Sequence, residues 1–128
     1  MHMLHHLSFA VRDIARSKRF YDATLTKVGY VCVWEDDTAV GYGSPGGGDK
    51  FAIKLRQDHV SIPSEGFHVA FSSPSRIAVD EFHAAALLNG GVDNGGVGIH
   101  PEYGANYYAA FVLDPDGYRV EAVINGKI

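Results

Sequence analysis

The sequence predicts an α+β fold in which two β-α-β-β-β modules follow one another within a single domain, residues 1–128. Segments that alternate apolar and polar residues indicate strands, and two longer segments with helical apolar spacing indicate helices. The same order of elements occurs twice. Five identical pairs are separated by 62 positions: His6 and His68, Phe9 and Phe71, Phe20 and Phe82, Leu25 and Leu87, Gly29 and Gly91. A repeat in constant register favours a duplicated unit, with modules at about residues 3–58 and 66–126.

The first module is predicted to contain a strand, a helix and three further strands, at residues 4–11, 14–27, 30–34, 38–42 and 51–55. Alternation in the first strand places Leu7 on one face and His6 on the other. Asp13 is a suitable N-cap for the helix, and Gly29 ends it. The last strand has its apolar residues on one face, so it directs Lys54 to the other.

The second module is predicted to repeat this order, at residues 67–71, 76–89, 91–93, 107–113 and 118–124. Ser75 offers an N-cap for the helix, and two glycines end it. The strand at 91–93 is short because three glycines follow it closely. We therefore expect residues 93–106 to form a long loop, which in a small domain is usually functional or mobile. Tyr103 in this loop either lines a pocket or packs as an ordinary surface aromatic.

The chain closes with a predicted antiparallel hairpin. Residues 114–117, Asp-Pro-Asp-Gly, favour a type I turn, with Pro at the second position and Gly at the fourth. The returning strand places Val120 on one face and both Arg119 and Glu121 on the other. Glu121 is thus a carboxylate on a strand whose opposite face is apolar.

Composition and charge exclude several classes of function. A net charge of −4 argues against a nucleic-acid footprint, which requires a clustered basic surface. No apolar segment approaches the roughly 20 residues needed to span a membrane. Cys32 is the only cysteine, so an intrachain disulfide is excluded, and this usage suits a reducing cytoplasm. We therefore expect a cytoplasmic protein without a nucleic-acid or membrane partner.

Three segments carry a family resemblance: HHLSFAVRDIARSKRFYDATL at residues 5–25, FHVAFSSPS at 67–75 and FVLDPDGYRVEAV at 111–123. Together with the repeat, they resemble the vicinal oxygen chelate superfamily, which includes glyoxalase I, bleomycin-resistance proteins and extradiol dioxygenases. The resemblance implies that the two modules join edge to edge. Their strands would then curl into a half-barrel sheet with the helices outside and the site in the concave interior.

The resemblance also implies a set of metal ligands. In the metal-dependent members, ligands come from the first and last strand of each module, and the corresponding positions here hold His6, His68 and Glu121. Two imidazoles and one carboxylate suit Fe(II) and also Mn, Ni, Co or Zn. The fourth position, where the family often has Glu or His, holds Lys54. This incomplete set argues against glyoxalase I itself.

Lys54 leaves several interpretations open, because an ammonium group is repelled by a nearby divalent cation. Its side chain could reach the mouth of the cleft or pair with Glu121 outside the ligand shell. It could also replace the metal, or act on the substrate as a base if burial or a nearby cation lowers its pKa. In a metal-free cleft we expect Lys54 and Glu121 to lie at hydrogen-bond distance.

Two functional hypotheses follow. The first is a divalent-metal-dependent enzyme for a small oxygenated substrate, either a lyase or isomerase or a ring-cleaving dioxygenase. Glu121 and Lys54 are then the candidate catalytic residues, and the substrate pocket includes Tyr103, Tyr107 and Arg119. The second is a metal-free protein that binds or sequesters a small molecule, as bleomycin-resistance proteins do. We favour the enzyme, with a divalent metal as cofactor unless Lys54 replaces it, and leave open a homodimer.

Overall fold

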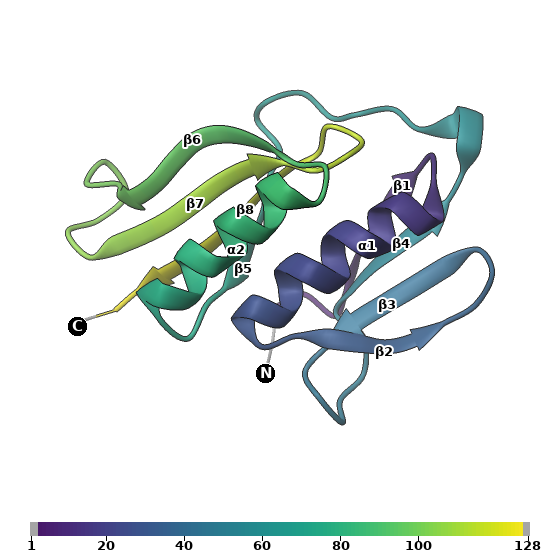
Figure 1. The fold of residues 1–128 in the computed structure, drawn as a ribbon, viewed down its shortest axis with the longest axis horizontal. Coiled ribbons are helices and arrows are strands. Elements are labelled where there is room, and N and C mark those ends of the chain that lie inside the picture. Colours follow the sequence, from purple (N-terminus) through teal and green to yellow (C-terminus); the bar gives the residue numbers. More distant parts are fainter. Residues whose placement is uncertain (1–2, 127–128) are drawn as a thin grey trace.

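A computed structural model describes residues 3–126 and confirms the predicted tandem-module α+β fold (Figure 1). Each module contains one strand, one α-helix and three further strands. The elements of the first module are β1 (Leu7–Val11), α1 (Ile14–Leu25), the 3-10 helix η1 (Thr26–Val28), β2 (Val31–Glu35), β3 (Ala39–Gly43), β4 (Phe51–Leu55). Those that follow are the 3-10 helix η2 (Gln57–His59), β5 (Val69–Ser72), α2 (Arg76–Leu88), β6 (Val92–Ile99), β7 (Tyr107–Leu113), β8 (Arg119–Asn125).

The strands form two mixed four-stranded sheets of the same topology, β1-β4-β3-β2 and β5-β8-β7-β6. The first strand of each module pairs in parallel with the last one, and the remaining pairs are antiparallel. Strand pairing in the described chain therefore stays within each module. The expected single sheet through both modules is instead two sheets whose edge strands, β1 and β5, do not pair with each other.

The helices lie side by side, each in front of the sheet of its own module (Figure 1). Phe20 of α1 and Phe82 of α2, equivalent in the repeat, are both fully buried in one hydrophobic cluster that draws on both modules. Apolar residues of each sheet face this shared core. We call the opposite side of each sheet its open face. Neither helix of the described chain is long and apolar enough to cross a membrane.

The helix termini follow the predicted capping, with one change. Side chains of Asp13 and Ser75 accept hydrogen bonds from backbone N–H groups at the start of α1 and α2. Gly29 ends the first helical segment with a left-handed φ of 96°, but in the second module Gly90, with φ 93°, takes that conformation. Gly91 serves close packing instead, since a Cβ there would lie 2.7 Å from the ring of Phe20.

The predicted loop at residues 93–106 is wrong in its first half. Strand β6 continues to Ile99 and pairs with β7 through an irregularity between Asp93 and Gly96. Its glycines were the reason to expect a loop, but Gly95 and Gly98 adopt positive φ angles of 139° and 151° within the strand. Such angles are accessible to glycine because it has no Cβ.

Two tyrosine hydroxyls form hydrogen bonds across the boundary between the modules, which we call the module seam. Tyr118 donates a 2.6 Å hydrogen bond to the carbonyl oxygen of Ala10 in β1, and Tyr30 donates one of 2.8 Å to that of Ser72 in β5. Ala10 and Ser72 are again 62 positions apart, so equivalent carbonyl groups of the two edge strands are satisfied from the opposite module. The ring of Tyr118 also stacks on Phe9 at 4.0 Å.

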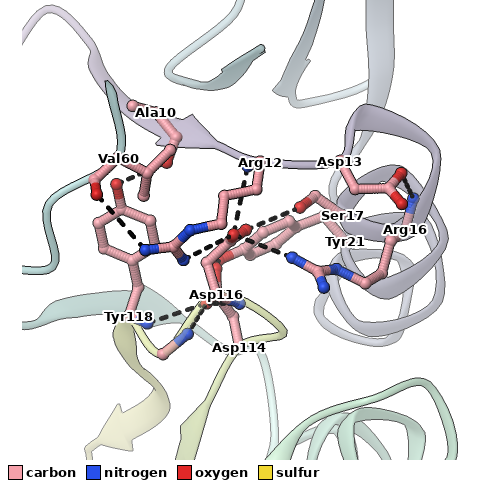
Figure 2. Close-up of polar contacts among 11 residues, drawn as sticks. Ala10, Arg12, Asp13, Arg16, Ser17, Tyr21, Val60, Asp114, Asp116 and Tyr118 are labelled. Carbon is pink, nitrogen blue, oxygen red and sulfur yellow. Dashed lines mark hydrogen bonds and ion pairs between the residues drawn. The ribbon is translucent and has the colours of Figure 1, made fainter. Parts of the chain in front are cut away.

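The turn between β7 and β8 inserts two buried carboxylates against α1, and Figure 2 shows both pointing toward that helix. Asp114 accepts from the Tyr21 hydroxyl at 2.6 Å and from three backbone N–H groups of its own turn. Asp116 accepts from the Ser17 hydroxyl and from the guanidinium groups of Arg12 and Arg16. Burial raises the pKa of Asp114 to about 6, although its hydrogen bonds act in the opposite direction.

Candidate active site

Glu121 is the centre of the candidate site. In β8 it lies opposite Phe111 of β7 and Ala70 of β5, and alternation directs its side chain to the open face of the second sheet. The side chain is nevertheless almost completely buried, with 1% of its surface exposed. The Tyr107 hydroxyl donates a 2.6 Å hydrogen bond to Oε2, and His68 Nε2 lies 2.9 Å from Oε1.

The two oxygens of Glu121 are not equivalent. Oε2 has a strong donor in Tyr107, whereas Oε1 is buried without an aligned hydrogen-bond donor despite its closeness to His68. A buried carboxylate oxygen without an aligned hydrogen-bond donor is costly and rare in folded proteins. Oε1 therefore marks a position where a positively charged or hydrogen-bonding group would be stabilised.

The side chains of Glu121 and His68 are placed so that both could bind one divalent metal ion. A carboxylate oxygen and an imidazole nitrogen are both common metal ligands, with bonds of about 2.0–2.2 Å. Two such bonds at a right angle would hold the ligand atoms about 3.0 Å apart, close to the 2.9 Å between Oε1 and His68 Nε2. The distance thus suits two adjacent ligands of one ion as well as an ion pair with a protonated imidazole.

His6 does not join this pair within the chain. Its Nδ1 lies 2.9 Å from Nδ1 of His5, and both residues line a mainly apolar cavity of about 380 Å³ between the modules. Across residues 3–126 no three His, Cys, Asp or Glu side chains lie close enough to hold a metal. The structure therefore brings together two of the three predicted ligands, His68 and Glu121.

Lys54 does not contact Glu121 as expected for a metal-free cleft. In β4 it pairs with Ala10 of β1 and Ala39 of β3, so it belongs to the first sheet, whereas Glu121 belongs to the second. Glu121 pairs with His68 instead, and Lys54 has no ion pair among the described residues. The expectation of this contact was conditional on a metal-free cleft and assumed one sheet shared by both modules, whereas within one chain the two residues lie in different sheets.

Aromatic side chains surround Glu121 on the open face. Tyr103 packs against Tyr107 with 5.2 Å between ring centroids, and His100 contacts Phe111 edge to face at 4.7 Å. Tyr103 is 61% exposed and forms the outer member of this group. Phe111 was missed as a site residue, although alternation places it on the same strand face as Tyr107. Nothing in the sequence distinguished His100.

The remaining predicted pocket residue, Arg119, lies beside Glu121 on β8 but contacts the segment between the modules. Its guanidinium donates a 3.2 Å hydrogen bond to the carbonyl oxygen of Pro63. Burial and the Glu121 carboxylate together raise the pKa of Tyr107, so its hydroxyl keeps its proton at neutral pH. Tyr107 therefore acts as the hydrogen-bond donor to Glu121.

The model of the Glyoxalase/Bleomycin resistance protein/Dioxygenase superfamily matches residues 3–122. A glyoxalase/bleomycin resistance protein from Albidiferax ferrireducens T118 has 30% sequence identity and a TM-score of 0.82, covering 98% of this chain and 100% of that one. None of the curated proteins searched matches significantly.

Two more distant structures share the fold. A glyoxalase-related enzyme from Fulvimarina pelagi has 19% identity and a TM-score of 0.74, covering 98% of this chain and 89% of that one. A glyoxalase/bleomycin resistance protein/dioxygenase family enzyme from Burkholderia phytofirmans PsJN has 15% identity and a TM-score of 0.69, covering 93% and 95%. Together with the family match over residues 3–122, these findings confirm the resemblance seen in the sequence: the chain belongs to the glyoxalase/bleomycin resistance protein/dioxygenase superfamily.

Proposed function

We propose that the protein is a divalent-metal-dependent enzyme that acts on a small oxygenated substrate, as a lyase or isomerase or as a ring-cleaving dioxygenase. The observation that carries this proposal is the buried Oε1 of Glu121, which has no aligned donor and lies 2.9 Å from His68 Nε2. His68 and Glu121 would hold the metal, with His6 as the predicted third ligand. When bound, such an ion polarises substrate oxygens and stabilises negative charge that develops on them.

The chain's own residues prepare this environment. Tyr107 holds the second oxygen of Glu121, which leaves Oε1 directed toward His68. Phe111 and Tyr103 provide apolar walls beside the carboxylate, and such walls keep competing water away from bound substrate. Two substrate oxygens would bind next to the metal ligands, with the substrate carbon skeleton against the aromatic rings.

The third ligand is best supplied by a second copy of the chain. Each chain has two open sheet faces: Lys54 lies in the first sheet and Glu121 in the second, and His6 directly precedes β1 at the edge of the first sheet. In a twofold-symmetric homodimer, the first sheet of each copy would cover the second sheet of the other. This arrangement forms two equal sites and lets His6 of one copy approach His68 and Glu121 of the other.

A second candidate function is metal-free binding of a small molecule. It is favoured by Lys54 at the fourth ligand position of the family, and by the lack of a three-ligand cluster within the described part of one chain. The apolar cavity of about 380 Å³ between the modules is of a size that accommodates a small ligand.

Metal binding distinguishes the two functions. The protein should be purified without a histidine tag, analysed for metals, and titrated calorimetrically with Fe(II), Mn(II), Ni(II), Co(II) and Zn(II). We expect tight binding of at least one ion, which Glu121→Gln abolishes because it removes the anionic ligand with little change in volume. Glu81→Gln, at an exposed position of α2, is the matched control. Absence of binding by the wild-type protein would overturn the enzyme in favour of the binding protein.

A further inference from the structure

Tyr107 distinguishes the two oxygens of the Glu121 carboxylate. Its hydroxyl lies 2.6 Å from Oε2, a distance typical of a strong O–H···O⁻ hydrogen bond. Oε1 receives no aligned donor and lies beside His68 Nε2. The sequence places Tyr107 near a pocket, but it does not reveal this contact between neighbouring strands.

We propose that Tyr107 is a positioning residue that makes Glu121 a one-oxygen ligand, with Oε1 toward the metal and Oε2 held away from it. This inference rests on the proposed metal site. A carboxylate bound through one oxygen occupies one coordination position rather than two. It therefore leaves an additional position for a substrate that binds through two oxygens.

The proposal follows from how freely a glutamate carboxylate rotates. The terminal torsion of glutamate has a broad, roughly twofold preference, so an unrestrained carboxylate samples many orientations. Tyr107 removes this freedom because its own position is fixed by pairing opposite Asn125 of β8 and by the adjacent ring of Tyr103. Partners that orient metal ligands in this way typically change metal affinity about 10- to 100-fold when they are replaced.

The same strand offers a matched control. Tyr108 donates its hydroxyl to Asp80 of α2, on the opposite side of the sheet from Glu121. Tyr108→Phe therefore removes the same kind of tyrosine–carboxylate hydrogen bond without touching the candidate site. Tyr107→Phe removes the donor to Glu121 and keeps the aromatic ring.

Two measurements test the proposal. Crystal structures of the metal-free variants should show the Glu121 carboxylate rotated in Tyr107→Phe and unchanged in Tyr108→Phe. Cobalt(II) titration, followed by visible absorption, should show about 10- to 100-fold weaker binding and an altered spectrum only for Tyr107→Phe.

An unchanged carboxylate orientation in Tyr107→Phe would overturn the positioning role, as would an unchanged cobalt spectrum in a protein that binds cobalt. If the wild-type protein binds no metal, the proposed enzyme function fails. The metal-free structures then still decide whether Tyr107 orients Glu121, so the two failures are distinguishable.

Discussion

The hydroxyl of Tyr21 in α1 donates a 2.6 Å hydrogen bond to Oδ2 of Asp114, in the turn that joins β7 and β8 of the other module. Both groups are buried, and 93 positions of sequence separate them. This bond, together with the contacts of Asp116, ties the first helix of one module to the last hairpin of the other.

Replacing Tyr21 by Phe should destabilise the fold. The change leaves Oδ2 of Asp114 buried without a donor, which costs about 1–3 kcal/mol. Tyr42→Phe is the matched control, because its hydroxyl donates to Asp22, whose side chain is 40% exposed and can bind water instead. Urea unfolding of both variants measures the difference. Equal destabilisation would show that the buried carboxylate has no special dependence on Tyr21.

Asp114 should make stability depend on pH in an unusual direction. Its pKa is raised from 3.8 to about 6, so the folded protein holds this proton more tightly than the unfolded chain. Its contribution to stability is therefore full below about pH 4 and is lost as the pH rises through about 6.

Asp114→Asn removes this titration while keeping a side chain of similar shape. The free energy of unfolding of the wild type, minus that of the variant, should decrease between about pH 4 and pH 7. Denaturant unfolding of both proteins at several pH values in this range measures this difference. A difference that stays constant or increases with pH would show that the hydrogen bonds to Asp114 outweigh its burial.

Gly91 should not tolerate a side chain. A Cβ at this position would lie 2.7 Å from the ring of Phe20 and 2.8 Å from the carbonyl oxygen of Ala86. We expect Gly91→Ala to destabilise the protein by about 1–3 kcal/mol through overpacking. Gly48→Ala is the control, since no atom lies within 4 Å of its built Cβ. Thermal unfolding compares them, and equal melting temperatures would contradict the close contact.

Mixed dimers test whether the site is shared between copies. His6→Ala and Glu121→Gln should each abolish metal binding in homodimers. In a heterodimer of the two variants, a shared arrangement concentrates both defects in one site and leaves the other intact. Differently tagged variants, purified together and analysed for metal after tag removal, should therefore recover one of the two sites. No recovery would place all ligands of a site in one chain.

Periodicity and repeat register were sufficient to predict the two modules, because both arise from local spacing of apolar residues. The extent of β6 was not predictable in this way. Its glycines resemble those of a loop, and only pairing with β7 holds Gly96 and Gly98 in a strand. Whether β1 pairs with β5 is likewise decided by packing between modules rather than by either strand's sequence.

The candidate site was predictable in part. Alternation and the family resemblance identified Glu121 and His68, which the structure brings within 2.9 Å. They also suggested His6 and Lys54, whose positions depend on how the two sheets are arranged. The role of Asp116 could not be foreseen, because its partners Arg12 and Ser17 lie 104 and 99 positions away. A turn sequence predicts local geometry but not burial.

The paired tyrosine hydroxyls at the module seam have a consequence for any attempt to divide the protein. A fragment containing only the first module would lose Tyr118, and one containing only the second would lose Tyr30. Each would then expose the free edge of β1 or β5, and an uncovered strand edge recruits strands from other chains. The separate halves should therefore aggregate when each is expressed alone. They should stay in solution when co-expressed, because each half then covers the exposed strand edge of the other.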